Sequence, residues 1–448
     1  MKFLDRFGIW VILAVGAFAR LWDLGYPHKL VFDETYYVKD AWTLSAAGHE
    51  LAWPNNPNAA FEIGSVNGFL NTPAYVVHPP LGKWIIALGM RVFGAQNSFG
   101  WRISVALIGI ATIYLAFAVA KRVLRSSRWA LFVAGLLAID GEAIVMSRIG
   151  LLDGILAFLA LLGFYFLLRD LESSNTTFWR RPWLLAMAAA LGAASAVKWS
   201  GIYFLAAFCL YLVGRFAFET KDAWASVQKA VATFFLTVPL ALATYLASWT
   251  GWFVTPGGYG KAADSNPFVA LLQYHEGAYN FHVNLTTTHP YAANPFTWLF
   301  MIRPTSFFYE SCGSGCSSAI TAIGNPLIWW AGAVAVITLF LGWVTNRDRT
   351  SGLTLLGLLG GYAPWLFYSQ RTVFWFYTIV FEFWVLLAIA LTLKRAVESS
   401  TRPNLVKGLA IAFFGASTVV SVFFYPIWVG TKIPYWFWLA HMWLPSWI

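Results

Sequence analysis

The chain has 448 residues, of which 59% are hydrophobic and only 11% are Asp, Glu, Lys or Arg. Soluble globular domains carry a charged fraction of about 25%, so this composition excludes an ordinary soluble enzyme. Apolar runs of about 18 residues or more recur along the sequence, and runs of that length are typical of transmembrane helices. The sequence therefore predicts an all-α polytopic membrane protein.

Hydropathy predicts eleven spans, and the first is expected to stay uncleaved because no small-residue cleavage site accompanies it. The expected spans cover residues 7–24, 100–121, 129–146, 150–168, 183–199, 201–217, 229–248, 326–345, 352–369, 373–393 and 405–425. The apolar run 81–93 is too short to cross comfortably, so it is expected to lie at the interface or to re-enter shallowly.

The distribution of basic residues predicts the orientation of these spans. With a cytoplasmic N-terminus, 18 of the 30 Lys and Arg residues fall inside, where the net charge is +11 against −1 outside. This asymmetry follows the positive-inside rule. The overall net charge of +10 therefore needs no nucleic-acid partner.

Two large regions are then expected outside the membrane, at about 25–99 and 249–325. They predict a module at 1–248 that contains the first outer region, a second outer loop at 249–325, and a C-terminal four-helix-type module at 326–448. All seven histidines lie outside in this topology. The chemistry is therefore expected to face away from the cytoplasm.

Asp33 and Glu34 directly follow the first span. If this stretch is helical, Asp33, Tyr36, Tyr37 and Asp40 share one face. Acids beside a span are rare and usually functional, which favours a general base or a metal-binding pair. The alternative is a solvated acidic lip, or partners for nearby Arg and Lys.

A set of basic residues is expected near these acids. The prolines of His78-Pro79-Pro80 fix an extended backbone just before Lys83. Arg102, Arg148, Asp153 and Lys198 stand at the outward ends of four spans, and Asp140 and Glu142 lie close to Arg148 in sequence. They either pair with one another across helices or hold the phosphate of a lipid-linked substrate.

The cysteine pattern predicts a disulfide rather than a metal site. Cys312 and Cys316 lie in the second outer loop, where an oxidising compartment permits a disulfide. A zinc site would need two more ligands, and His289 is some distance away in the sequence. His275 and His282 are seven residues apart and could share a helix face. Cys209 falls inside a span and reads as a small core residue.

Several motifs resemble those of the bacterial, actinobacterial-type branch of the protein O-mannosyltransferases, a family of GT-C membrane glycosyltransferases. Two of these motifs lie in the first outer region: Phe32-Asp33-Glu34-Thr35-Tyr36-Tyr37 and His78-Pro79-Pro80-Leu81-Gly82-Lys83. Two more lie at the ends of spans: Ser147-Arg148-Ile149-Gly150-Leu151-Leu152-Asp153 and Ala196-Val197-Lys198-Trp199-Ser200-Gly201. The second outer loop contributes Phe281, His282, His289, Pro290, Tyr291, Trp298, Arg303 and Pro304, and the chain ends on Met442-Trp443-Leu444-Pro445-Ser446-Trp447. The loop 249–325 is too short for the β-trefoil domain of eukaryotic relatives. Asn294-Pro295-Phe296, on the acceptor side, departs from the serine and tryptophan that the family pattern has around that proline.

The resemblance implies transfer of mannose from polyprenyl-phosphate-mannose to Ser or Thr of polypeptides, at the outer face of the plasma membrane, with the secretion translocon as a possible partner. It implies Asp33 as the base of an inverting reaction and Glu34 as a sugar or acceptor contact. For the donor it implies Lys198, with Lys83 or Arg102, at the phosphate, His78 nearby, and Arg148 and Asp153 bracing helix ends. For the acceptor side or for structure it implies Tyr37, Asp40, His282, His289 and Arg303. No metal or other cofactor is expected.

Elementary chemistry agrees with this implication. A polyprenyl phosphate leaves as a stable anion, so the reaction needs one carboxylate as base and cations at the phosphate, but no general acid. Two alternatives stay open. One is a sister GT-C enzyme that moves another lipid-linked sugar to a lipid or glycan. The other is a transporter or flippase, which would have mid-membrane charges and paired broken helices in two matching halves.

Overall fold

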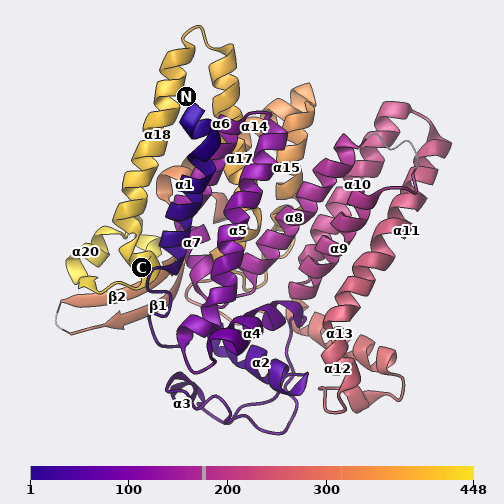
Figure 1. Ribbon diagram of the computed structural model, residues 1–448, viewed down its shortest axis with the longest axis vertical. Helices are drawn as coiled ribbons and strands as arrows, with labels where there is room; N and C mark the ends of the chain where they lie inside the picture. Colours follow the sequence, from indigo (N-terminus) through magenta and orange to yellow (C-terminus); the bar gives the residue numbers. More distant parts are fainter. Residues whose placement is uncertain (1, 174–177, 314) are drawn as a thin grey trace.

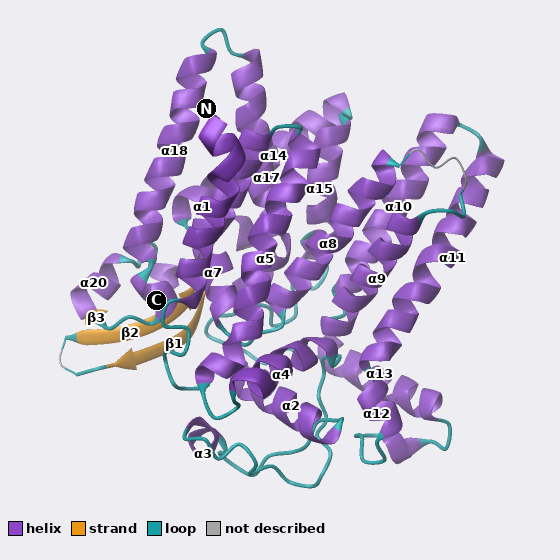
Figure 2. Cartoon of the chain, in the orientation of Figure 1, coloured by secondary structure: helices purple, strands orange, loops and turns teal. Residues whose placement is uncertain are grey.

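The computed structural model describes residues 2–173, 178–313 and 315–448, and most of them are helical (Figures 1 and 2). The long helices form a bundle, and smaller elements gather at one end of it. The long helices are α1 (Lys2–Leu21), α5 (Ser98–Leu124), α6 (Ser127–Ile139), α8 (Asp153–Glu172), α9 (Pro182–Val197), α10 (Gly201–Thr220), α11 (Ala223–Ser248), α14 (Pro326–Asn346), α15 (Arg349–Gly361), α17 (Ile379–Ser399) and α18 (Pro403–Phe424).

Each predicted span overlaps one of these helices, and two of the spans are broken into two helical pieces. The count of eleven transmembrane helices is not confirmed. Within the described residues, seven helices are long and apolar enough to cross a membrane, and an eighth crossing results if α6 and α7 (Gly141–Arg148) form one span bent by 57°. The bend lies at Asp140, whose side chain accepts from the backbone N–H of Glu142 and so starts α7. The expected span 352–369 is also broken, because α15 ends at Gly361 and α16 (Ala363–Leu366) follows with Pro364 in its first turn.

The first outer region packs against one end of the bundle. It contains α2 (Glu34–Ala47), α3 (Asn58–Glu62) and α4 (Leu81–Phe93), which lie together below α5 in Figure 1. Helix α4 has the bounds expected for the short apolar run 81–93. It approaches α5 closely at Gly89, where a Cβ atom would lie 2.7 Å from the carbonyl oxygen of Gly100. This close packing holds α2 and α4 at the start of α5.

The second outer region contains a small β-sheet that the all-α prediction missed. The region runs through α12 (Thr250–Val254), η1 (Lys261–Ala263), α13 (Pro267–Val283) and η2 (Pro295–Phe300). Strands β1 (Thr305–Ser311) and β2 (Cys316–Ala322) then form an antiparallel hairpin, and β3 (Ile433–Pro434) pairs with β2. Cys312 and Cys316 form the predicted disulfide at the tip of the hairpin. The sheet depends on a strand from the C-terminal end of the chain, which no local pattern reveals.

Short elements complete the C-terminal part. They are η3 (Trp375–Thr378) before α17, then α19 (Pro426–Val429), α20 (Tyr435–Ala440) and η4 (Pro445–Trp447) after α18. Cys209 is half-buried on α10, and its thiol lies 3.6 Å from the hydroxyl of Thr237 on α11. It is a helix-packing residue, as the sequence suggested.

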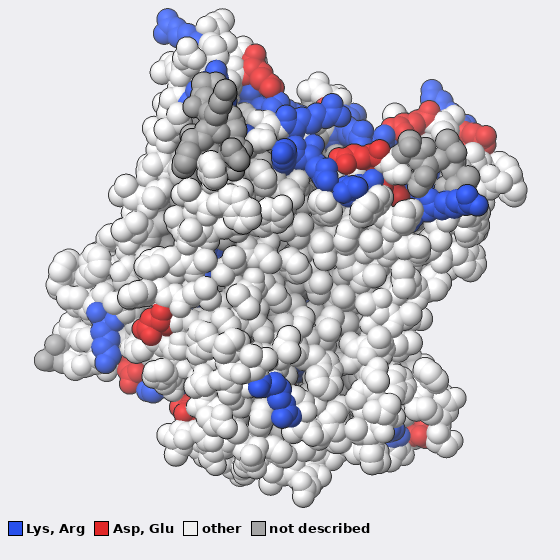
Figure 3. Space-filling view, in the orientation of Figure 1, with Lys and Arg blue, Asp and Glu red and all other residues white. Residues whose placement is uncertain are grey.

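Charged side chains are unevenly distributed between the two ends of the bundle. Figure 3 shows most of the visible Lys and Arg residues gathered at the end where the N-terminus lies, away from α2 and α4. That end includes Arg122 and Arg125 at the end of α5, Arg349 at the start of α15, and Lys394 and Arg395 near the end of α17. This is the asymmetry that the positive-inside pattern predicts for a membrane protein.

Candidate active site

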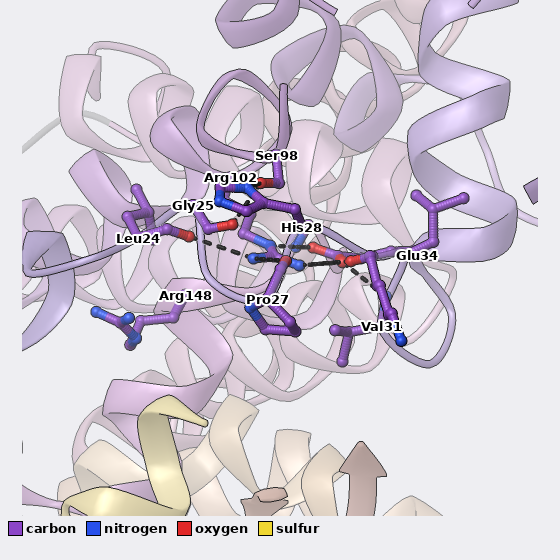
Figure 4. Close-up of polar contacts among 12 residues, drawn as sticks. Leu24, Gly25, Pro27, His28, Val31, Glu34, Ser98, Arg102 and Arg148 are labelled. Atoms are coloured by element: carbon purple, nitrogen blue, oxygen red, sulfur yellow. Dashed lines mark hydrogen bonds and ion pairs between the residues drawn. The ribbon is translucent and has the colours of Figure 1, made fainter. Parts of the chain in front are cut away.

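Glu34 is completely buried and forms a structural ion pair with Arg102 (Figure 4). Its carboxylate accepts two hydrogen bonds of 2.8 Å from the Arg102 guanidinium, one of 2.9 Å from the N–H of Val31 and one of 2.7 Å from the N–H of Gly150. These bonds use the acceptor capacity of the carboxylate. The expected contact of Glu34 with sugar or acceptor is therefore wrong for this arrangement.

Arg102 is equally committed to structure. Besides Glu34, its guanidinium donates to the carbonyl oxygens of Leu24, Pro27 and Lys29, and the residue is 1% exposed. Figure 4 shows it wedged between the loop after α1 and the start of α2. Arg102 clamps this loop, so the expectation that it binds the donor phosphate is also wrong.

Arg148 closes the C-terminal end of α1. Its guanidinium donates to the carbonyl oxygens of Ala19, Arg20, Trp22 and Asp23, at distances of 2.7 to 3.3 Å. A cation at this end satisfies carbonyls that the helix leaves unpaired. These contacts give Arg148 the helix-bracing role that the resemblance implies.

Lys83 pairs with an acid that the sequence reading did not single out. Its ammonium, in the first turn of α4, forms an ion pair with Glu50 and donates to the carbonyl oxygen of His78 at 3.1 Å. Lys83 is 1% exposed. Lys83 ties α4 to the segment after α2 and, unlike Lys198, does not line the cavity described below, so the structure does not support the expected phosphate contact of Lys83.

Asp33 differs from its neighbour Glu34. It occupies the N-cap position of α2, and its carboxylate makes no hydrogen bond or ion pair with any residue in the described ranges. Burial raises the pKa of Asp33 to about 6; the charge of Lys198 lowers it, and that of Asp153 raises it. Asp33 is thus a half-buried carboxylate without a protein partner in the described ranges, in the field of the Lys198 and Asp153 charges.

The backbone before Asp33 is strained. Phe32 has a φ of 50°, in the left-handed region that a bulky residue rarely adopts. Its ring is held by a stack on Phe307, at 4.7 Å between centroids, and by edge contacts with Phe374 and Phe376. Such strain persists where the surroundings over-determine it, often at active sites. Here the aromatic cluster fixes the backbone conformation of Phe32 and therefore the position of the next residue, Asp33.

The predicted common face of α2 is only partly formed. Tyr37 is buried, whereas Tyr36 is 63% exposed and points away from the site. Burial raises the pKa of Asp40 to about 7; Lys83 lowers it and Glu50 raises it, so Asp40 adjoins the Lys83–Glu50 pair. Asp40 belongs to the support of the site, and Tyr37 to its wall.

A cavity of about 120 Å³ is lined by Lys198 and Asp153, the two residues whose charges shift the pKa of Asp33, although Asp33 itself is not part of the lining. Lys198, directly after α9, donates a 2.7 Å hydrogen bond to Asp153 at the start of α8. Its ammonium lies 5.1 Å from the ring centroid of Tyr377 and 6.0 Å from that of Tyr37. The lining also includes His78, Trp199, Tyr203, His282, Trp365, Tyr368 and Arg371.

Arg371 is a cavity residue that sequence reasoning missed. Its Nη2 donates to Nδ1 of His282 at 3.0 Å, and Nε2 of His282 donates to the carbonyl oxygen of Val77 at 3.0 Å. The Nε of Arg371 is buried without a hydrogen-bond partner. The signal was present, because Arg371 stands at the outward end of an expected span, as Lys198 does.

His78 and His282 are neutral residues of the cavity wall. Their rings stack at 5.2 Å between centroids. Burial, assisted by the charge of Arg371, lowers the pKa of His282 to about 4, and burial also lowers the pKa of His78. Neutral His282 can accept from Arg371, which orients the guanidinium toward the cavity.

Three other predicted residues lie outside the cavity lining. His275 bonds Tyr245 at 2.5 Å and stacks on Trp199. His289 packs against Phe374 at 4.9 Å between centroids, next to the Phe32 cluster. Arg303 donates to the carbonyl oxygens of Pro290 and Ile448, so it anchors the C-terminal segment and has a structural role.

The fold resembles those of solved membrane enzymes at low sequence identity. The S. cerevisiae protein O-mannosyltransferase Pmt1-Pmt2 complex bound to the sugar donor gives a TM-score of 0.76 at 16% identity, covering all of this chain and 93% of that chain. ArnT from Cupriavidus metallidurans bound to undecaprenyl phosphate gives 0.57 at 17% identity, covering 93% and 69%. This similarity places the chain in the GT-C glycosyltransferase fold class.

Sequence comparison narrows the class to a family. Residues 74–252 match the model of the dolichyl-phosphate-mannose-protein mannosyltransferases, and residues 267–447 match that of the C-terminal four TMM region of protein-O-mannosyltransferase. The polyprenol-phosphate-mannose–protein mannosyltransferase of Mycolicibacterium smegmatis is 30% identical, covering 99% of this chain and 94% of the relative. That of Corynebacterium glutamicum is 30% identical, covering 98% and 93%. The chain belongs to the protein O-mannosyltransferase family.

Proposed function

We propose that this protein transfers mannose from polyprenyl-phosphate-mannose to Ser or Thr hydroxyls of polypeptides, with Asp33 as the general base. The observation that carries the proposal is the contrast between the two adjacent acids. Glu34 is saturated by Arg102 and backbone N–H groups, whereas Asp33 is unbonded, raised in pKa to about 6 and electrostatically coupled to Lys198. A base of this pKa is ionised at neutral pH and can still accept a proton during the reaction.

The reaction needs little beyond these groups. Asp33 takes the proton of the acceptor hydroxyl while the hydroxyl oxygen bonds to the anomeric carbon of mannose. The bond from that carbon to the phosphate oxygen breaks with inversion, and the phosphate leaves as an anion. Lys198 and Arg371 line the same cavity, where their positive charges stabilise the leaving phosphate. Asp153 holds Lys198 in place, and His282 holds Arg371.

The proposed mechanism uses no metal ion. Two basic side chains supply the positive charge that a divalent cation supplies in other transferases. Within the described residues, no group of three or more His, Cys, Asp and Glu side chains is arranged to hold a metal. Undiminished transfer after exhaustive chelation with EDTA supports this part of the proposal, and restoration by added Mg²⁺ or Mn²⁺ refutes it.

The protein is a multi-pass membrane protein, and we propose the plasma membrane with a cytoplasmic N-terminus. The gathering of Lys and Arg at the N-terminal end of the bundle supports this orientation (Figure 3). Asp33 then lies on the opposite, extracytoplasmic side, where polypeptides leaving the secretion translocon are available as acceptors. Labelling of single cysteines placed at Lys221 and Lys432 with an impermeant reagent tests the orientation, since only the second is expected to react from outside.

The central experiment incubates purified protein with labelled polyprenyl-phosphate-mannose and a Ser/Thr-rich peptide. Asp33→Asn is expected to lower transfer by about two orders of magnitude or more, the range lost with a general base. The matched control is Asp23→Asn, an exposed acid in the loop after α1, whose left-handed backbone asparagine tolerates. Near-normal turnover of Asp33→Asn would remove Asp33 from this role.

Donors with other sugars and lipid acceptors, offered in parallel, test for the sister GT-C reaction.

A further inference from the structure

The end of the bundle remote from Asp33 contains a groove that the proposed reaction does not use. It has a volume of about 620 Å³ and lies among the C-terminal parts of α5, α8 and α17 and the start of α15. Helix α5 has 27 residues, so its two ends are about 40 Å apart. Because Arg102 in the first turn of α5 contacts Glu34, the end of α5 lies far from the catalytic acid. We call this the distal groove.

The distal groove is strongly basic. Its lining contains two acids, Glu172 and Glu398, and five basic residues, Arg122, Arg125, Arg349, Lys394 and Arg395. The net charge of the lining is therefore +3. Figure 3 shows basic side chains gathered at this end of the molecule.

Some of this charge is already paired. Arg122 lies 3.4 Å from Glu172, Lys394 lies 2.6 Å from Glu398, and Arg395 lies 2.5 Å from Asp348. These contacts account for three of the five basic residues.

The other two basic residues have no protein partner among the described residues. Arg125 and Arg349 are exposed, and across the described parts of the chain neither makes a hydrogen bond or an ion pair. They come from different helices, at the end of α5 and the start of α15. In addition, the Nε of Arg122 is buried without a hydrogen-bond partner. Leaving a buried N–H without a partner is unfavourable, so this atom also points to a missing acceptor.

Apart from Thr350, the rest of the lining is apolar. Leu124, Leu168, Leu353 and Leu391 are buried at the bottom of the groove. Arg122 and Arg125 also line a neighbouring groove of about 690 Å³ that follows α5 and α8 past Tyr114, Phe117 and Leu162. Helices α5 and α8 both meet the length and hydropathy of membrane spans, so this second groove lies against the lipid. A ligand with a phosphate in the distal groove can place an acyl chain there.

We propose that the distal groove binds the phosphate headgroup of an anionic phospholipid, with Arg125 and Arg349 as its principal ligands and Arg122 Nε as a third donor. Guanidinium groups bind phosphate through paired N–H donors, and basic pockets between transmembrane helices are suited to anionic headgroups. The apolar floor and the neighbouring lipid-facing groove favour a lipid over a soluble phosphate. Glu172 and Glu398 do not prevent binding, because each is neutralised by its partner.

The test measures lipid retention by the full-length protein. Purified protein in mild detergent is titrated with phosphatidylglycerol or phosphatidylcholine, and bound lipid is counted by native mass spectrometry. We expect phosphatidylglycerol to bind and phosphatidylcholine to bind about tenfold more weakly or worse. Arg125→Gln with Arg349→Gln is expected to weaken phosphatidylglycerol binding by about tenfold or more, because each basic residue near an anionic lipid contributes about 1 kcal/mol. Bound lipid is also expected to raise the melting temperature of the unmodified protein but not of this double variant.

The control removes the same charge from the same end without touching the groove. Arg347→Gln with Lys407→Gln changes two exposed residues that are absent from the lining, and it is expected to retain phosphatidylglycerol. If the glutamine pair at 125 and 349 does not fold, Arg125→Lys with Arg349→Lys replaces it and is expected to bind more weakly than the unmodified protein. Equal loss in the control and the groove variants overturns the site. Full competition by soluble pyrophosphate overturns the assignment to a lipid.

Discussion

Arg102 on α5 donates two hydrogen bonds of 2.8 Å to Glu34 at the start of α2, and both side chains are buried. This pair joins residues 68 positions apart in the sequence and holds the loop that carries Asp33. It therefore separates the roles of two adjacent acids. Glu34 keeps the loop in place, whereas the Asp33 carboxylate has no hydrogen-bond or ion-pair partner among the described residues.

The first prediction concerns the stability that this pair provides. Glu34→Gln leaves the Arg102 charge buried without its partner, and breaking a buried ion pair costs roughly 3 to 5 kcal/mol. We expect a clear fall in the melting temperature of the purified protein, followed by tryptophan fluorescence. The control is Lys29→Gln, because the Lys29–Glu310 pair is about half exposed and contributes at most about 1 kcal/mol. An unchanged melting temperature in Glu34→Gln would contradict the clamp.

The second prediction concerns pH. Since the pKa of Asp33 is raised to about 6, kcat/KM for mannosyl transfer is expected to be constant above that value and to fall about tenfold per pH unit below it. Unfolding linked to Asp33 cannot produce this fall. Its folded-state pKa exceeds the ordinary 3.8, so its protonation stabilises the folded protein, and that contribution is lost as the pH rises through about 6.

Asp40 provides the control for this profile, because burial raises its pKa to about 7. Asp40→Asn is expected to leave the inflection near pH 6 in place. An inflection that disappears in Asp40→Asn would assign the titration to Asp40 and remove the evidence for Asp33.

The third prediction concerns the donor phosphate. Lys198→Gln is expected to raise KM for polyprenyl-phosphate-mannose about tenfold or more, the loss typical of a charge-assisted hydrogen bond, with a smaller effect on KM for the peptide. The substitution also leaves Asp153 unpaired, so Lys198→Gln with Asp153→Asn separates binding from stability. Lys432→Gln, an exposed lysine on the same side of the molecule, serves as control. Equal weakening of donor and peptide would argue against a phosphate contact.

The fourth prediction concerns Arg371 and the histidine that orients it. Arg371→Gln is expected to raise KM for the donor about tenfold or more, and Arg371→Lys to recover only part of this loss, because lysine keeps the charge but not the planar fork. His282→Ala removes the 3.0 Å contact to Arg371 and is expected to act in the same direction but less strongly. Arg91→Gln, an exposed arginine on α4, is the control. Normal donor KM in both Arg371 variants would place Arg371 outside the donor site.

The sequence by itself determined the membrane class, the positions of the hydrophobic segments, the surface helix 81–93 and the motifs that mark the family. Each of these is a local or compositional property: hydropathy over about 20 residues, the side on which Lys and Arg gather, and short runs such as Phe32-Asp33-Glu34. The sequence also brought Asp33, Lys198 and the Cys312–Cys316 pair forward as candidates.

Only the tertiary structure decided which charged residues are free to act. Glu34, Arg102 and Lys83 were candidates for substrate contacts, but packing gives each of them buried structural partners away from the cavity lining, whereas Lys198 lines the cavity. Arg371 lines the cavity and contacts His282, 89 positions earlier in the sequence, and no local pattern shows that contact. The β-sheet likewise needed a strand from the C-terminal end. The physical reason is the same in each case. Ion pairs and strand pairs join residues that are distant in the sequence, and neither hydropathy nor helical periodicity indicates which distant residues will meet.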